Sequence, residues 1–151
     1  MRICMGSDHA GLDLKLVVKA HLEAQGHEVT DVGTYTPESC DYPQYGAACA
    51  RKVVAGEADY GILICGTGIG ISMAASKVPG TRVALCTDTY MAKMTRMHND
   101  ANILAFGARV LGEGLALDIV DMFLNTAFEG GRHARRVNMI MDLEKDTQPS
   151  E

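Results

Sequence analysis

The hydrophobic pattern alternates between short apolar runs and longer stretches in which apolar residues recur every three or four positions. The short runs predict β-strands at 2–5, 28–32, 60–65, 82–86 and 103–106. The helical spacing predicts helices around 12–20, 45–53, 70–75, 88–94 and 115–124, and a last helix behind the basic segment 132–136. Thr87 and Asp88 can cap the fourth of these helices. Strands and helices therefore alternate along almost the whole chain.

This alternation predicts the fold class. We expect a single-domain, Rossmann-like α/β fold: a doubly wound parallel sheet of about five strands, with helices on both faces and a C-terminal helix. The domain would span 1–145, and 146–151 would form a flexible C-terminal tail. The run at 60–65 is the most continuously apolar and predicts a buried central strand. In such folds ligands bind where loops leave the carboxyl ends of the strands.

Composition narrows the classes of function. The 151 residues are 47% hydrophobic and 22% charged, as in an ordinary soluble domain, and carry a net charge of −5 without a long Lys/Arg run. We therefore expect neither a nucleic-acid partner nor a membrane, because no apolar stretch approaches the ~18 residues of a membrane span. The cysteines are odd in number and lack CxxC or zinc-finger spacing, which predicts reduced thiols in a cytoplasmic protein.

The strongest local motif is the glycine-rich loop at 66–70, Gly-Thr-Gly-Ile-Gly. Its glycines let backbone N–H groups turn inward and meet an anion at a helix N-terminus. A dinucleotide fingerprint would need a third glycine at Ile71, and no GxxxxGK[ST] segment is present. The loop thus predicts an anionic ligand, with a turn used only for tight packing as the structural alternative.

Three residues near the predicted strand ends are candidates for chemistry. Cys65 ends the central strand directly before the glycine loop, where N–H dipoles can stabilise a thiolate that serves as nucleophile, redox centre or proton acceptor. Asp8 and His9 follow the first strand, whose loop should neighbour that of the third strand, so both are expected to face Cys65. The structural alternatives are a helix cap for Asp8 and a solvated position for His9.

Two further clusters lie later in the chain. His98, in the polar segment 97–102, can move protons near neutral pH, or the segment is a plain turn. Arg132 and Arg136 are four residues apart after two glycines, which puts two guanidinium groups on one helix face and suits a phosphate. A solvated basic face is the alternative.

Taken together, these motifs resemble the type B ribose-5-phosphate isomerases, which belong with the galactose-6-phosphate and allose-6-phosphate isomerases. The matching runs are Gly-Ser-Asp-His-Ala-Gly at 6–11, Asp-Tyr-Pro at 41–43, Ile-Cys-Gly-Thr-Gly-Ile-Gly-Ile-Ser at 64–72, His-Asn-Asp at 98–100 and Glu-Gly-Gly-Arg-His at 129–133. They span nearly the whole chain in the family's order. Some members of the family lack the cysteine and place a carboxylate elsewhere. In this chain the equivalent of that carboxylate, near Ala74 or Ala75, is a small residue, so the chain resembles the branch that uses a cysteine.

The resemblance implies interconversion of an aldose phosphate and a ketose phosphate without a metal or organic cofactor. It implies a homodimer or tetramer with active sites at the subunit interface and a phosphorylated sugar as substrate. Cys65 would be the base at C2 and C1, Thr67 would assist the proton shuttle, and His98 with Asp8 would open the sugar ring. The implied substrate-binding set is Asp8, His9, Asp41, Tyr42, Gly66, Thr67, Gly68, Ile69, Gly70, Ser72, Asn99, Arg109, Arg132 and Arg136.

Within this resemblance, ribose 5-phosphate and ribulose 5-phosphate are the expected pair. A hexose-phosphate isomerase acting on allose 6-phosphate or galactose 6-phosphate is the alternative, because pocket depth separates the two and the sequence does not report it. A third reading is a sugar-phosphate-binding module without turnover. Binding alone needs none of Cys65, Thr67 and His98, so their joint presence favours an enzyme.

Overall fold

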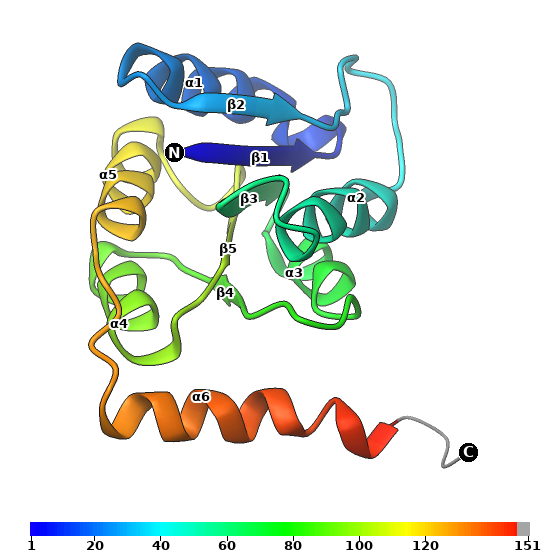
Figure 1. The fold of residues 1–151 in the computed structure, drawn as a ribbon. Helices are drawn as coiled ribbons and strands as arrows, with labels where there is room; N and C mark the ends of the chain where they lie inside the picture. The colour runs from blue at the N-terminus through cyan, green and yellow to red at the C-terminus, as the bar shows by residue number, and fades with distance from the viewer. Residues whose placement is uncertain (148–151) are drawn as a thin grey trace.

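The structure, a computed structural model, describes residues 1–147 and contains one parallel sheet (Figure 1). Its five strands lie in the order β2-β1-β3-β5-β4. They are β1 (Arg2–Ser7), β2 (Glu28–Asp31), β3 (Tyr60–Cys65), β4 (Val83–Leu85) and β5 (Ile103–Gly107). Because all pairs are parallel, the carboxyl ends of the strands share one edge of the sheet.

Helices cover both faces of the sheet. They are α1 (Leu12–Ala24), α2 (Tyr42–Val54), α3 (Ile69–Ala75), α4 (Thr89–Asn99), α5 (Glu113–Leu124) and α6 (Arg132–Asp142), with short 3-10 helices η1 (His9–Gly11) and η2 (Lys145–Thr147). One apolar core joins the sheet to α1, α4 and α5, and a second joins it to α2 and α3. None of the helices within 1–147 is long and apolar enough to cross a membrane.

The predicted α/β class is confirmed, and differences occur at element ends. β3 has the predicted bounds. β1 continues two residues beyond its predicted end, to Ser7, because Ser7 pairs with Ile64 of β3. β4 is shorter than the predicted run at 82–86, since this edge strand pairs only with β5 over three positions. Strands buried on both faces are easily seen in a sequence, while the length of an edge strand depends on its single neighbour.

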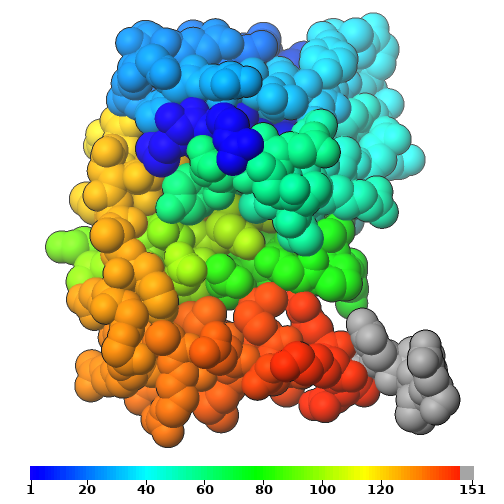
Figure 2. Space-filling view, in the orientation of Figure 1, coloured from blue at the N-terminus to red at the C-terminus, as the bar shows by residue number. Residues whose placement is uncertain are grey.

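α6 lies along one side of the molecule, as its orange-to-red surface in Figure 2 shows. It begins after Gly131, as the two glycines predict, and of its residues only His133 and Val137 are buried. η2 follows at Lys145–Thr147, so Asp146 and Thr147 of the predicted tail are helical. The remainder of that tail, 148–151, lies outside the described residues.

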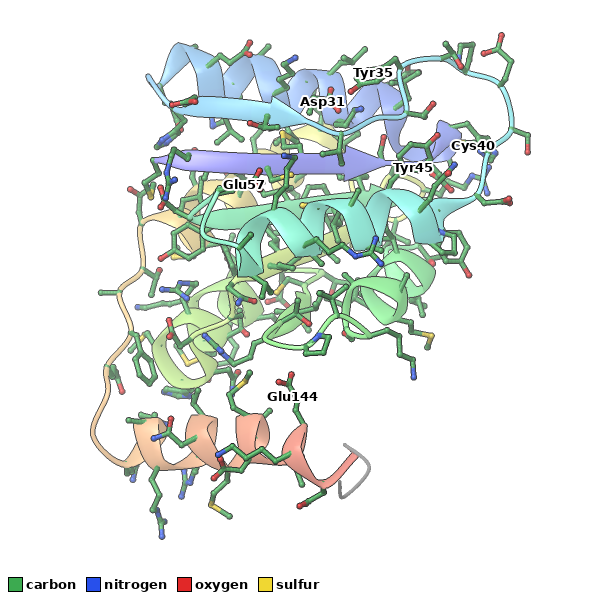
Figure 3. All side chains as sticks on the ribbon, turned by 45° about the vertical axis from the view of Figure 1, so that its right-hand side comes forward. Asp31, Tyr35, Cys40, Tyr45, Glu57 and Glu144 are labelled. Carbon is green, nitrogen blue, oxygen red and sulfur yellow. The ribbon has the colours of Figure 1, made fainter. Side chains whose placement is uncertain are left out.

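The segment that connects β2 to α2 runs past Tyr35 and Cys40 (Figure 3), and a buried ion pair holds its beginning. Lys15 Nζ lies 2.7 Å from Asp31 Oδ1 and donates to the carbonyl oxygen of Thr34 at 2.6 Å. The Lys15 side chain is 0% exposed and that of Asp31 7%. Because this segment leads to Cys40 and to the start of α2, the ion pair positions residues at the carboxyl edge of the sheet.

Candidate active site

The end of β3 presents a buried thiol to the glycine loop. Cys65 is 4% exposed, and its Sγ accepts a hydrogen bond from the backbone N–H of Gly68 at 3.1 Å. Gly68 has a left-handed backbone (φ +81°), which turns this N–H back toward the sulfur. The N–H dipole points at the position where a thiolate would carry its charge.

The loop is tightly enclosed by its neighbours. A Cβ at Gly68 would lie 2.6 Å from the carbonyl carbon of Phe106, and one at Gly70 would lie 2.5 Å from the ring of Tyr42. Arg109 places its guanidinium beside Gly66, where a Cβ would meet Nη1 at 3.2 Å. Backbone bonds from Ala108 N–H to the Cys65 oxygen and from Arg109 N–H to the Gly66 oxygen, both 2.9 Å, tie the loop to the end of β5.

Asp8 and His9 lie at the same edge, because β1 and β3 are neighbours as expected. Asp8 Oδ1 accepts the N–H of Gly11 at 3.1 Å and so caps η1, while a functional role of this carboxylate stays a prediction. His9 Nδ1 accepts the N–H of Cys40 at 3.2 Å and is thereby fixed to the connection before α2. Cys40 was not among the predicted site residues, and no motif in the sequence indicates its contact with His9.

Hydroxyl and carboxylate groups complete this edge. Thr67 is exposed, and its Oγ1 accepts the N–H of Ile69 at 3.2 Å. Ser72 Oγ donates to the oxygen of Ile69 at 2.7 Å, so this hydroxyl is satisfied within its own helix. Asp41 occupies the N-cap position of α2 without a capping bond from its side chain, which leaves its exposed carboxylate available to a ligand.

Four predicted site residues lie at the other edge of the sheet: His98, Asn99, Arg132 and Arg136. His98 and Asn99 end α4, directly before β5 begins, whereas Cys65 pairs with Gly107 at the other end of β5. The length of β5 thus separates them, about 13 Å at the usual rise per residue. Within one subunit, the thiol, the glycine loop and Arg109 lie together, but these four residues do not join them.

The end of α4 is held firmly at this amino edge. Asp88 caps the helix start by accepting the N–H of Met91 at 2.7 Å, as predicted, and Asp100 ends it in a left-handed conformation. The buried Arg96 donates to Asp100 Oδ1 at 2.9 Å and to the oxygen of Ala101 at 2.6 Å. The sequence contained a signal for this placement, because a segment directly preceding a parallel strand must lie at the amino edge.

His98 belongs to a cluster with Glu129 and His133. The rings of His98 and His133 stack with centroids 4.1 Å apart and planes 10° apart. Glu129 Oε2 lies 3.2 Å from His133 Nε2 and 3.9 Å from His98 Nε2. Burial lowers the pKa of His133, the neighbouring His98 and Arg132 lower it further, and Glu129 raises it.

The ring nitrogens of His98 and His133 and a carboxylate oxygen of Glu129 lie within 4.8 Å of one another. Among residues 1–147, this is the group of three that is compact enough to hold a metal ion. The stacked rings do not suit this role. Each imidazole lone pair lies in the plane of its ring, so in two nearly parallel rings the lone pairs run side by side and do not converge.

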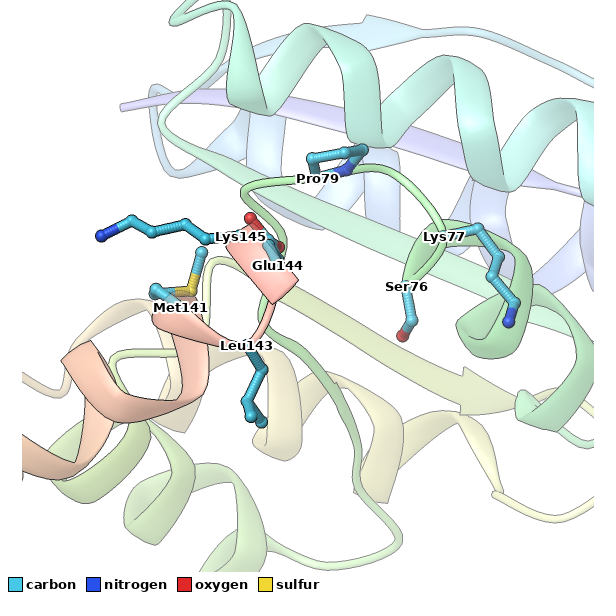
Figure 4. A pocket seen from close by; sticks show the side chains of 7 residues that line it. All are labelled: Ser76, Lys77, Pro79, Met141, Leu143, Glu144 and Lys145. Carbon is cyan, nitrogen blue, oxygen red and sulfur yellow. The ribbon is translucent and has the colours of Figure 1, made fainter. Parts of the chain in front are cut away.

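A hollow of about 640 Å³ lies between the loop after α3 and the end of α6 (Figure 4). Its lining consists of Ser76, Lys77, Pro79, Met141, Leu143, Glu144 and Lys145. None of the predicted site residues lines it. Glu144 crosses between the two segments and accepts the N–H of Gly80 at 2.9 Å, so the hollow reflects how α6 docks and is separate from the glycine loop.

Fold and loop together define an α/β protein with a buried thiol and a glycine-rich loop at the carboxyl edge of its sheet, and comparison with known families assigns it to the sugar isomerases. A model of the Ribose/Galactose Isomerase family matches residues 3–140. The chain belongs to the ribose/galactose isomerase family. Its relatives support the type B branch.

Ribose-5-phosphate isomerase B of Escherichia coli is 50% identical over 144 residues, which cover 95% of this chain and 97% of that protein. A solved structure of ribose-5-phosphate isomerase B from Clostridium thermocellum has 56% identity and a TM-score of 0.97, covering 98% and 100% of the two chains. The enzyme from Mycoplasma genitalium, solved with bound ribulose 5-phosphate, has 41% identity and a TM-score of 0.93, covering 97% of each chain.

Proposed function

We propose that this protein interconverts ribose 5-phosphate and ribulose 5-phosphate, with Cys65 as the base. The observation that carries the proposal is the buried Sγ at the end of β3, which accepts the Gly68 N–H at the mouth of the glycine loop. Relatives that share about half of this sequence are ribose-5-phosphate isomerases, and one structural neighbour holds ribulose 5-phosphate.

The chemistry of this loop suits proton transfer between adjacent carbons. Cys65 takes the proton from C2 of the open-chain aldose and returns it to C1, which passes through a cis-enediol or enediolate. Backbone N–H groups of the loop 66–70 hold the charge that develops on the oxygen. Thr67, exposed at the loop tip, assists the proton shuttle or binds a sugar hydroxyl. No step requires a metal or an organic cofactor.

The phosphate and the ring-opening group require a second copy of the chain. His9 and Arg109 lie at the carboxyl edge, whereas Arg132, Arg136 and His98 lie at the amino edge of the same subunit. A homodimer in which the amino edge of one subunit faces the carboxyl edge of its partner unites both groups. α6 and the residue that follows it offer apolar surface for such contact, since Met139 and Leu143 are 61% and 63% exposed.

In the united site, His98 of one subunit protonates the ring oxygen while Asp8 of the other receives the hydroxyl hydrogen. Asn99 then lies near the enediolate oxygen, and Asp41 and Tyr42 border the sugar. Arginine pairs on the phosphate hold C1 and C2 within reach of the sulfur.

The test replaces the proposed base. Cys65→Ala should lower kcat for ribose 5-phosphate by about 10²–10⁴-fold with little change in KM, because a general base contributes that much and the small side chain adds little binding. Steady-state assays with Cys86→Ala as a control for loss of another buried thiol measure the effect. Turnover close to wild type in Cys65→Ala would refute the assignment.

The same assay identifies the substrate. Comparing kcat/KM for ribose 5-phosphate, allose 6-phosphate and galactose 6-phosphate tests the pentose assignment against the hexose alternative. The expected result is a clear preference for the pentose phosphate. Binding of all three without turnover would favour a module that only binds sugar phosphates.

A further inference from the structure

The His98, Glu129 and His133 cluster joins three separate parts of the chain. His98 ends α4, Glu129 lies in the connection after α5, and His133 lies in the first turn of α6. The backbone N–H of Glu129 donates to the oxygen of Met97 at 3.1 Å, which fixes the connection against the end of α4. The cluster is therefore held by the backbone as well as by its side chains.

The three side chains differ in exposure. The His133 side chain is 9% exposed, while that of His98 is 38% exposed and remains accessible to a ligand. The stacked His133 ring fixes the plane of the His98 ring, and Glu129 Oε2 lies along the Nε2 edges of both. An exposed imidazole supported on one face and one edge loses rotational freedom before any substrate binds.

We propose that Glu129 and His133 are positioning residues that orient His98 for opening the sugar ring. The inference rests on the proposed function and deepens it, because it assigns a role to two side chains that the proposed mechanism does not use. Neither residue needs to touch the substrate.

The experiment separates ring opening from proton transfer. Ribose 5-phosphate is mainly cyclic and needs ring opening before isomerisation. Ribulose 5-phosphate cannot close a furanose ring, because its O5 carries the phosphate, so exchange of its C1 hydrogen with solvent deuterium tests the Cys65 step alone. Both reactions are measured in Glu129→Gln, His133→Ala and His133→Phe, with Glu23→Gln on exposed α1 surface as the matched control.

Glu129→Gln and His133→Ala should lower kcat for ribose 5-phosphate by about 10–100-fold, no more than His98→Asn does, since misplacing a catalytic group costs up to about 10²-fold. Deuterium exchange into ribulose 5-phosphate should stay within about threefold of wild type. His133→Phe keeps an aromatic ring for stacking and should recover part of the loss seen in His133→Ala.

Unchanged isomerisation in Glu129→Gln and His133→Ala would overturn the inference, as would an equal loss of isomerisation and exchange, which indicates general damage to the fold. Loss of wild-type isomerisation on adding EDTA would also overturn it, because the cluster would then hold a metal. Failure of the proposed function looks different: the wild-type protein itself would neither isomerise nor exchange either sugar.

Discussion

At the scale of single residues, the site depends on how closely the backbone of the glycine loop approaches its neighbours. Gly68 combines a left-handed φ of +81° with main-chain atoms of Phe106 on the side where a Cβ would project. The glycine pattern predicted a loop whose N–H groups turn inward, and the Gly68 N–H does so toward Cys65 Sγ, whereas binding of an anion by this loop stays a prediction. Which atoms pack against each glycine was not predictable, because they come from β5 and α2, which are distant in sequence.

Gly68→Ala tests this close approach. We expect kcat to fall at least tenfold and the free energy of unfolding to fall by more than the ~1–2 kcal/mol that a left-handed non-glycine residue costs, because the new Cβ would meet backbone that cannot rotate away. Gly56→Ala is the matched control, since Gly56 has φ +75° and open space around it. Chemical denaturation and kcat are compared, and equal effects in both variants would show that enclosure of the loop is unimportant.

At the scale of elements, a buried ion pair determines where the β2–α2 connection lies. The charges of Lys15 and Asp31 are removed from water, and each is compensated by the other and by backbone groups: the Thr34 oxygen for Lys15 and the Gly33 N–H for Asp31. The helical pattern predicted α1, but it could not reveal that a lysine on this helix is fully buried. Burial of a lysine depends on a partner that only the folded chain supplies.

Lys15→Met should therefore lower the free energy of unfolding by about 3–5 kcal/mol, because it leaves the carboxylate of Asp31 buried without its partner. The exposed pair Lys52–Glu57 provides the control, and Lys52→Met should leave the free energy of unfolding almost unchanged, because water already solvates both charges. Urea denaturation measures both. The double variant Lys15→Met/Asp31→Leu removes both charges and should be more stable than Lys15→Met. If it is not, the unpaired carboxylate does not cause the loss of stability.

At the scale of the whole molecule, the predicted site residues divide between two edges of one subunit. The parallel sheet places every strand-to-helix loop at one edge and every helix-to-strand loop at the other. Cys65 and Arg109 follow strands, whereas His98 precedes one and Arg132 begins α6 beside the end of α4. We therefore propose that a complete site combines residues of two subunits.

Mixing two inactive variants tests this arrangement. Cys65→Ala and His98→Asn homodimers should each be nearly inactive, but after subunit exchange half of the dimers are mixed, and each mixed dimer contains one site with both native groups. Activity should then rise to about a quarter of the wild-type value, measured after denaturing and refolding the mixture. A mixture no more active than its components would show that each site lies within one subunit.

Local interactions encoded what could be read directly from the chain: the alternation of strands and helices, the central apolar strand, the cap at Asp88 and the glycine loop after Cys65. These features depend on residues within a few positions of one another, so periodicity and short motifs reveal them. The order β2-β1-β3-β5-β4, the buried Lys15–Asp31 pair, the His9–Cys40 contact and the stacking of His98 on His133 arise from packing between distant segments. These contacts form only in the folded protein, because the partners come within reach of each other when the apolar faces of the helices pack on the sheet.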